Sequence, residues 1–252
     1  MAERIIKLTL EYDGSNYAGW QLQADVVTVQ GVVEEALAKV LKEPTRVHGA
    51  GRTDAGVHAA GQTAHFKTVS AMPVDAFTRA LNSLLPDDVS VLSAEEAPPG
   101  FHARYSAKAR TYRYAVTFAD SVFTRRHAWY VRPPLNVGAM SEAAALLAGE
   151  HDFAAFGNAS EDYDVTVRRI TEIRVNETLG GLEVYVTANA FLYKMVRNIM
   201  AVMVRVGRGE TAPEGVPRLL CGTVRADLKA TDAHAPWPPA PPQGLTLMKV
   251  WY

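Results

Sequence analysis

The chain has 252 residues, enough to bury a core in one large domain or two small ones. Apolar residues make up 48% and charged residues 21% of it, which is typical of a soluble globular protein. The longest apolar runs are too short to span a bilayer, and the N-terminus lacks the apolar core of a signal peptide. The single cysteine, Cys221, excludes a disulfide framework and a cysteine-rich zinc site. We therefore expect a cytoplasmic protein without membrane association.

Hydrophobic periodicity predicts a strand, helix, strand, strand, helix and strand in the first half of the chain. Thr28 is suited to cap the first helix, and Pro73 opens the second. A turn at residues 12–15 ends the first strand. The predicted strands are 5–11, 45–47, 62–67 and 89–92, and the predicted helices are 29–41 and 73–85.

The second half repeats this order. Its predicted strands are 110–118, 168–177, 181–188 and 245–251, its helices are 140–147 and 191–206, and residues 152–156 are extended. Two β-α-β-β-α-β halves suggest a duplicated ferredoxin-like arrangement with a mainly antiparallel sheet, in the α+β class. We place the N-terminal half at 1–105 and the C-terminal half at 106–252. The proline-rich residues 235–242 predict a stiff connector before the last strand.

Residues 49–58 combine three glycines with an arginine, an aspartate and a histidine. Glycine allows positive φ and lets another molecule approach the backbone closely. Asp54 in such a loop is suited to covalent or acid–base chemistry at a carbon atom, with Arg52 holding it ionised or binding a phosphate. The alternative is that Asp54 only closes a tight turn.

Other kinds of site have less support. The pattern Gly49-x-Gly51-x-x-Asp54 differs from a dinucleotide fingerprint, because a carboxylate replaces the third glycine and a strand, not a helix, is predicted after it. No phosphate loop and no G-x-S-x-G elbow occur. His58 and His65 have no second carboxylate nearby, so a catalytic metal site has little support.

Residues 104–132 are strongly basic, although the net charge of the whole chain is −1. Their only acidic residue is Asp120. Basic side chains interleaved with aromatic rings are typical of a surface that binds RNA or DNA, but also of a strand-rich segment with a solvated basic face. The basic residues are Arg104, Lys108, Arg110, Arg113, Arg125, Arg126 and Arg132, and the aromatic residues are Tyr105, Tyr112, Tyr114, Phe118, Phe123, Trp129 and Tyr130.

Two residues outside the glycine-rich loop also suit a site. Tyr112 lies on the strand predicted at 110–118, where its ring could stack on a base or join the core, whereas we assign Tyr114 to the core. Arg197 comes early in a largely apolar helix and needs an anionic partner, for which Asp54 is a candidate.

Together these residues resemble the TruA family of tRNA pseudouridine synthases, over nearly the whole chain. The family's signature loop is similar to Gly51-Arg52-Thr53-Asp54-Ala55-Gly56-Val57-His58-Ala59, followed by Gln62 and His65-Phe66. Its other segments occur in the same order, as Glu11-Tyr12-Asp13-Gly14, Gly19-Trp20-Gln21, Phe101-His102-Ala103-Arg104, Arg110-Thr111-Tyr112-Arg113-Tyr114, Phe191-Leu192-Tyr193-Lys194-Met195-Val196-Arg197-Asn198 and Gly244-Leu245-x-Leu247.

The resemblance implies a pseudouridine synthase fold and isomerisation of uridine at positions 38, 39 and 40 of the tRNA anticodon stem-loop. It implies Asp54 as nucleophile and Arg52 as the residue that helps to flip the target base. It also implies that Tyr112 stacks on the flipped uracil and that Arg197 pairs with Asp54. A homodimer without cofactor or metal is implied, each tRNA contacting both subunits. The residues it implies for RNA contact are Phe101, His102, Ala103, Arg104 and Tyr105.

The sequence leaves several points open. Asp54 could attack the base, attack the ribose, or abstract a proton after bond cleavage. Residues 158–167 depart from the family pattern, because Glu161, Asp162 and Asp164 stand where polar or basic residues often face tRNA. The rival hypotheses are a non-catalytic RNA-binding protein or tRNA-folding chaperone, against which the intact Arg52-Thr53-Asp54 argues, and a nucleotide-cofactor enzyme.

Overall fold

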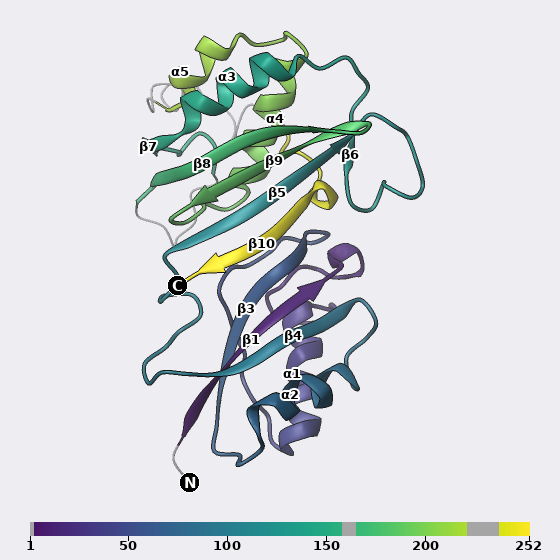
Figure 1. Cartoon of the computed structure of the whole chain (residues 1–252), viewed down its shortest axis with the longest axis vertical. Helices are drawn as coiled ribbons and strands as arrows, with labels where there is room; N and C mark the ends of the chain where they lie inside the picture. Colours follow the sequence, from purple (N-terminus) through teal and green to yellow (C-terminus); the bar gives the residue numbers. More distant parts are fainter. Residues whose placement is uncertain (1–2, 158–164, 221–236) are drawn as a thin grey trace. The chain divides into compact units, whose positions relative to one another are not determined.

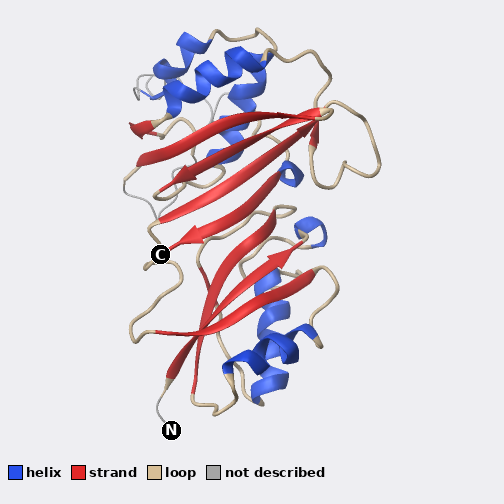
Figure 2. Cartoon of the chain, in the orientation of Figure 1, coloured by secondary structure: helices blue, strands red, loops and turns tan. Residues whose placement is uncertain are grey.

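The computed structural model describes residues 3–157, 165–220 and 237–252. It mixes helices with strands that pair mainly in the antiparallel sense, which confirms this part of the predicted fold class (Figures 1 and 2). The chain divides into two compact units. The first unit comprises Met1–Lys108 with Thr246–Tyr252, and the second comprises Ala109–Leu245.

The first unit contains β1 (Arg4–Tyr12), α1 (Val29–Leu41), β2 (His48–Gly49), β3 (His58–Thr68), α2 (Val74–Asn82), β4 (Val89–Ala97) and nearly all of β10 (Leu245–Trp251). Its strands lie in the order β4-β1-β3-β10, with β2 also beside β3. β1 is antiparallel to both of its neighbours. β10 pairs in parallel with β3, so residues at opposite ends of the sequence share one sheet.

The core of the first unit follows from the alternation of apolar residues along β1. Ile6, Leu8 and Leu10 point to one face, as expected for a period of two, and all three are fully buried. Phe77 of α2 and Phe66 of β3 pack edge to face, with ring centroids 5.4 Å apart. The amphipathic face of α2 is therefore fixed on the sheet by buried aromatic surface.

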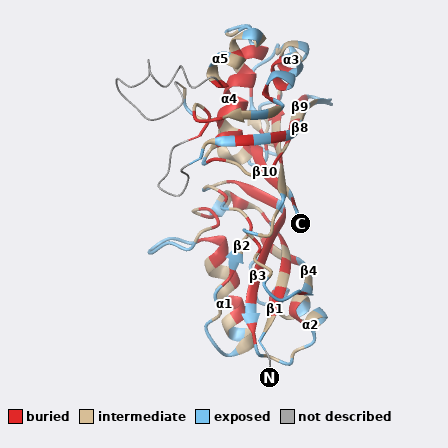
Figure 3. Ribbon diagram, turned by 90° about the vertical axis from the view of Figure 1, so that its left-hand side faces the viewer, coloured by how far each residue is buried: buried red, intermediate tan, exposed pale blue. Residues whose placement is uncertain are grey.

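The second unit contains β5 (Ala109–Thr117), β6 (Trp129–Tyr130), α3 (Val137–Leu147), β7 (Gly149–Asp152), β8 (Val167–Thr178), β9 (Gly181–Ala188), α4 (Met195–Gly207) and α5 (Val216–Leu220). Its strands lie in the order β5-β9-β8-β7, with antiparallel pairing throughout, and β6 pairs in parallel with β5. α3 packs on β8 and on α4. α4 is buried along most of its length, as the red ribbon in Figure 3 shows.

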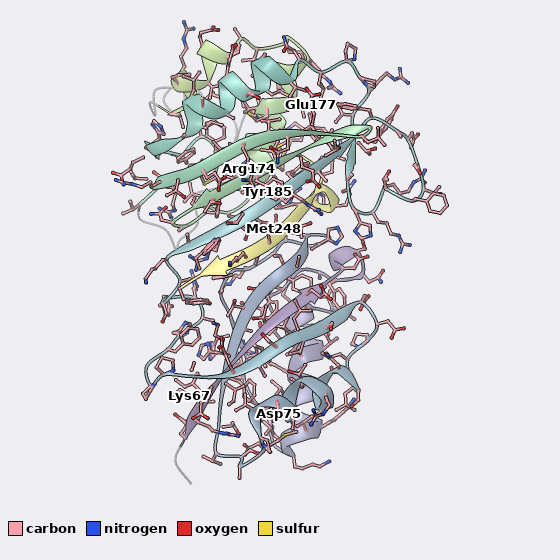
Figure 4. The ribbon with its side chains drawn as sticks, in the orientation of Figure 1. Lys67, Asp75, Arg174, Glu177, Tyr185 and Met248 are labelled. Carbon is pink, nitrogen blue, oxygen red and sulfur yellow. The ribbon has the colours of Figure 1, made fainter. Side chains whose placement is uncertain are left out.

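The two faces of the second sheet differ in polarity. On one face, Arg113 forms an ion pair of 3.2 Å with Glu183, and the guanidinium of Arg174 lies over the Tyr185 ring (Figure 4). The neighbouring residue Tyr114 points to the other face and is fully buried. The assignment of Tyr114 to the core is confirmed.

Several predicted elements agree closely with the structure. The helix predicted at 29–41 is α1, and the Thr28 hydroxyl accepts a hydrogen bond of 3.2 Å from the Gly31 N–H, as a cap does. The final predicted strand, 245–251, is β10. The prediction for 191–206 was wrong at its start, because Lys194 adopts φ 60° and the helix begins only at Met195. Arg197 therefore lies in its first turn.

The strand predicted at 45–47 and most of the extended segment predicted at 152–156 were also wrong. Residues 45–47 are irregular, and pairing begins at β2 because His48 is the first residue aligned with β3. In 152–156 only Asp152 belongs to β7. The chain then turns, with the Phe156 N–H donating to the Phe153 carbonyl at 2.8 Å, and both rings are buried. The prediction of an extended segment fails beyond Asp152, because a turn buries both rings equally well.

Within the described ranges, no helix has the length and apolarity that a bilayer crossing requires. Cys221, the acidic residues Glu161, Asp162 and Asp164, and the start of the predicted proline-rich connector lie outside the described residues.

Replacing Phe77 with alanine is expected to destabilise the chain by about 3–5 kcal/mol, because a fully buried ring is lost and a cavity remains. The measurement is the free energy of unfolding from urea titration monitored by circular dichroism. Phe123, whose side chain is 90% exposed, supplies the matched control: Phe123→Ala should change that free energy by less than about 0.5 kcal/mol. Equal losses in the two variants would contradict the assigned core.

Candidate active site

Asp54 lies in the loop between β2 and β3, at the first position of a tight turn. The Val57 N–H donates to the Asp54 carbonyl at 3.1 Å, and Gly56, the third residue of the turn, has φ 76°. A type II turn requires a positive φ at that position, which explains the glycine. The Asp54 side chain is half-buried, and the neighbouring Arg52 side chain is exposed. Asp54 therefore belongs to a tight turn, and this position is compatible with a chemical role for its carboxylate.

A second segment, residues 13–20, packs directly on this loop. The Trp20 N–H donates to the Thr53 carbonyl at 3.0 Å. A Cβ on Gly19, which has φ 98°, would lie 2.5 Å from the same carbonyl, and a Cβ on Gly14 would lie 2.0 Å from the Val57 carbonyl. Both glycines are therefore required for the two backbone segments to touch.

Gly49 has a similar role. A Cβ there would lie 2.5 Å from the Trp20 indole, whose side chain is fully buried. The sequence suggested that the glycines admit a bound molecule. At Gly49 the close neighbour is instead a side chain of the same chain.

The buried side chains of Tyr12, Thr53 and Gln62 form a chain of hydrogen bonds that supports the Asp54 loop. The Tyr12 hydroxyl and the Thr53 hydroxyl are hydrogen-bonded at 2.8 Å, and Gln62 Nε2 donates to the Gly51 carbonyl at 2.7 Å and to the Tyr12 hydroxyl at 3.4 Å. Burial raises the pKa of Tyr12 to about 12, partly offset by its two hydrogen bonds, so its hydroxyl stays protonated. The sequence analysis assigned no role to Tyr12 or to the Gln62 side chain, although both occur in the family segments.

His58 is the first residue of β3 and is buried. Its Nδ1 accepts from the Gly14 N–H at 3.0 Å and lies 3.1 Å from Asp13 Oδ1. The hydrogen bond from Gly14 fastens the start of β3 to residues 13–14. His58, the histidine of the signature loop, therefore has a structural role at the start of β3.

Residues 101–105 form a compact turn on the first unit. The Ala103 N–H donates to His65 Nδ1 at 3.2 Å, and the fully buried Ala103 is also held through its carbonyl by the Tyr252 hydroxyl at 2.8 Å. The ring of His102 lies 4.4 Å from that of Tyr105, whose side chain is 76% exposed. Ala103 anchors the turn, and the exposed surface comes from its neighbours.

Arg104 adds positive charge to this surface. Its guanidinium lies 5.7 Å from the centre of the Tyr105 ring. Phe101 is half-buried and packs on the ring of Tyr252 with centroids 5.0 Å apart. A basic side chain beside an exposed ring is the pairing that single-stranded nucleic acid binds.

Tyr112 and Arg197 belong to the second unit. Tyr112 is on β5 with 8% exposure, and its ring meets that of Phe191 edge to face at 5.0 Å. Arg197 is half-buried in the first turn of α4, and its Nε donates to the Ala240 carbonyl at 2.7 Å, which fixes the plane of the guanidinium. Each of these side chains is therefore held in place by its own unit.

Comparison with known proteins assigns the chain to a class. The sequence model described as tRNA pseudouridine synthase matches residues 9–106 and 143–252. A protein of Geobacter sulfurreducens named tRNA pseudouridine synthase A is 46% identical over 98% of this chain and 99% of its own length. One of Ruminiclostridium cellulolyticum with the same name is 44% identical over 99% of this chain and all of its own length.

These matches define the chain as an isomerase. It belongs to the tRNA pseudouridine synthase family, which converts uridine to pseudouridine. The family resemblance seen in the sequence is confirmed, and the nucleotide-cofactor hypothesis is not supported. The loop after Gly49-x-Gly51 leads into a strand, β3, as predicted, where a dinucleotide site has a helix.

The stability of the chain is expected to fall as the pH is lowered through the range 6.5 to 4. Burial, with smaller effects of His102 and His48, lowers the pKa of His65 to about 4, whereas an unfolded histidine titrates near 6.5. Between these values the unfolded chain binds a proton that the folded chain does not. His65 should therefore cost about 2 kcal/mol of stability between pH 7 and pH 5.

The measurement is urea unfolding of the parent and of His65→Gln at both pH values. Glutamine keeps an acceptor for the Ala103 N–H but does not titrate. The variant should lose less stability at pH 5 than the parent does. An identical pH dependence in the two proteins would show that His65 does not cause it.

Proposed function

We propose that this enzyme isomerises uridine to pseudouridine at positions 38, 39 and 40 of the tRNA anticodon stem-loop, with Asp54 as the nucleophile. The observation that carries the proposal is the half-buried carboxylate of Asp54 on a fixed turn. The turn is held by the backbone hydrogen bond from Trp20 to Thr53 and by the side-chain hydrogen bond between Tyr12 and Thr53. The relatives named tRNA pseudouridine synthase A, which align over nearly their whole length, support it.

The chemistry suits a lone carboxylate. The bond between ribose C1′ and uracil N1 breaks, a bond between C1′ and C5 forms, C5 loses a proton and N1 gains one. No atom or electron is supplied from outside. A carboxylate can attack an electron-poor carbon and leave again, which holds one fragment while the uracil turns. Asp54 would perform this step, and Arg52 lies two residues before it in the same loop.

The remaining roles concern access to the base. A target uridine must leave its stack, at a cost of roughly a few kcal/mol. We propose that the exposed Arg52 helps to flip the base and that Tyr112 stacks on the flipped uracil. We also propose that Arg197, oriented through Ala240, pairs with the Asp54 carboxylate. A carboxylate is bound most strongly by a planar, bidentate partner such as a guanidinium.

We further propose that residues 101–105 contact the tRNA, with Arg104 on phosphate and Tyr105 on a base or ribose. The enzyme is proposed to act as a homodimer in the cytoplasm, each tRNA contacting both subunits. This arrangement places basic and aromatic surface from two chains on one polyanion.

The two units are proposed to be the ferredoxin-like halves of a pseudouridine synthase fold, predicted at 1–105 and 106–252. In the first unit, α1 joins β1 to β2, and both strands are antiparallel to β3. β1 and β2 are thus parallel with β3 between them, which is a split βαβ unit. This order of elements supports the proposal for the first half.

Replacing Asp54 with asparagine is expected to lower turnover by roughly 10⁴-fold or more, because an amide is neither a nucleophile nor a base here. The assay is tritium release from tRNA labelled as [5-³H]uridine, combined with mapping of pseudouridine in the product. The parent should modify positions 38, 39 and 40 only.

Binding of tRNA to Asp54→Asn should stay within about threefold of the parent, as measured by filter binding. Asp75→Asn, on the exposed side of α2 (Figure 4), is the matched control and should keep full activity. Undiminished turnover in Asp54→Asn would remove Asp54 from the mechanism. Tight tRNA binding by the parent without any pseudouridine would favour the RNA-binding or chaperone hypothesis.

Replacing Tyr105 with alanine is expected to raise KM for tRNA by about 5- to 100-fold and to leave kcat nearly unchanged, since one stacking contact contributes about 1–3 kcal/mol. Steady-state tritium release measures both constants. Tyr105→Phe retains the ring and should behave like the parent. A fall in kcat without a change in KM would contradict a role in binding.

A further inference from the structure

The hydrogen-bonded chain of Tyr12, Thr53 and Gln62 contacts the loop that carries Arg52 and Asp54, the two residues proposed to act on the substrate. All three members are buried, with exposures of 4%, 6% and 0%. Gln62 contacts the Gly51 carbonyl, and through the Tyr12 hydroxyl it reaches the Thr53 side chain. The residues on either side of Arg52 are therefore tied to the same glutamine.

The strands that carry this chain are themselves shaped for it. β1 and β3 pair regularly up to Leu10↔Gln62, and the register then shifts before Tyr12↔Ala59. Such an irregularity re-aims the next side chain. The shift lies between Leu10, which faces Gln62, and Tyr12. The Tyr12 hydroxyl comes within hydrogen-bond distance of both Gln62 and Thr53.

Thr53 is held on two sides. Its hydroxyl bonds to Tyr12, and its carbonyl accepts from the Trp20 N–H at 3.0 Å. The Trp20 ring in turn lies 6.1 Å from the Tyr12 ring. The residue before Asp54 therefore has little freedom to rotate, and the direction of the Asp54 side chain is set accordingly.

A glutamine at this position carries a stability cost. Gln62 is completely buried, and its Oε1 has no hydrogen-bond partner within the part of the chain that the structure describes. Leaving a buried acceptor unpaired costs about 1–3 kcal/mol, which offsets part of what the two hydrogen bonds donated by Nε2 contribute. Groups that lower stability in this way are concentrated at functional sites.

We propose that Gln62 and Tyr12 are positioning residues of the isomerisation: they fix the position and orientation of the loop that carries Arg52 and Asp54. They act through Gly51 and Thr53 and do not touch the substrate. This inference rests on the proposed role of Asp54. A displacement of about 1 Å in a reacting group can cost on the order of 100-fold in rate, so one hydrogen bond is enough to matter.

The test uses Tyr12→Phe, Thr53→Val and Gln62→Met, each of which removes polar atoms and keeps the shape of the side chain. Each variant should lower kcat by about 10- to 100-fold, with KM for tRNA within about threefold of the parent. Thr68→Val is the matched control: it removes another buried threonine hydroxyl with one hydrogen bond, at the far end of β3 from the loop, and should keep the parent kcat.

The double variant Tyr12→Phe/Thr53→Val sharpens the test. Tyr12→Phe removes the hydrogen bonds to both Thr53 and Gln62, and Thr53→Val removes only the first of these. The double variant should therefore lose about as much kcat as Tyr12→Phe alone, and not the product of the two losses. Thermal melts and circular dichroism establish the folded fraction of each protein, and kcat is corrected for it.

Two results would overturn the proposal. One is a parent-like kcat in Tyr12→Phe and Gln62→Met. The other is a kcat loss that disappears after correction for the folded fraction, which would indicate a purely structural role. If Asp54→Asn retains turnover, the proposed function itself fails. If Asp54 is essential and these variants are fully active, only the positioning role fails.

Discussion

The close contact between residues 13–20 and the Asp54 loop is the constraint on which the site depends. Backbone meets backbone there, through the Trp20 N–H and the Thr53 carbonyl, and no side chain larger than hydrogen fits at Gly19 or Gly14. The turn that displays Asp54 lies on this contact. Its stiffness comes from packing and hydrogen bonds inside the first unit, so the site can be rigid before any RNA arrives.

The same design holds for the turn at residues 101–105, which is proposed to contact RNA, and for the residues of the second unit. Ala103 is anchored so that Arg104 and Tyr105 can project, and Arg197 is oriented by a backbone carbonyl. In each case a buried neighbour fixes the backbone or the plane of a side chain. The exposed group then needs to lose little conformational freedom on binding, which favours affinity.

The elements with a local cause could be predicted from the sequence. Thr28 caps α1, and alternation along β10 marks that strand, so both were located correctly. The start of α4 could not be found, because the positive φ of Lys194 has no periodic pattern in the sequence. The short β2 likewise exists only because β3 lies beside it.

The candidate site divides in the same way. Asp54 and Arg52 stand in one short, distinctive motif, so the sequence alone indicated them. Tyr12 and Gln62 are far apart in the sequence and meet only because β1 and β3 are neighbours. Neither residue type suggests chemistry by itself, and their shared contact with the loop becomes visible only in three dimensions.

The parallel pairing of β10 with β3 has a consequence for how the protein is made. The unit that carries Asp54 is formed from residues up to Lys108 together with Thr246–Tyr252. On the ribosome, the edge of β3 near His58 must wait for the synthesis of Thr246 and Leu247, a delay on the order of ten seconds at ordinary rates of synthesis. Unpaired strand edges promote aggregation. The second unit is therefore synthesised while the first is still incomplete. The sheet that supports the Asp54 loop is completed only after β10 has been synthesised.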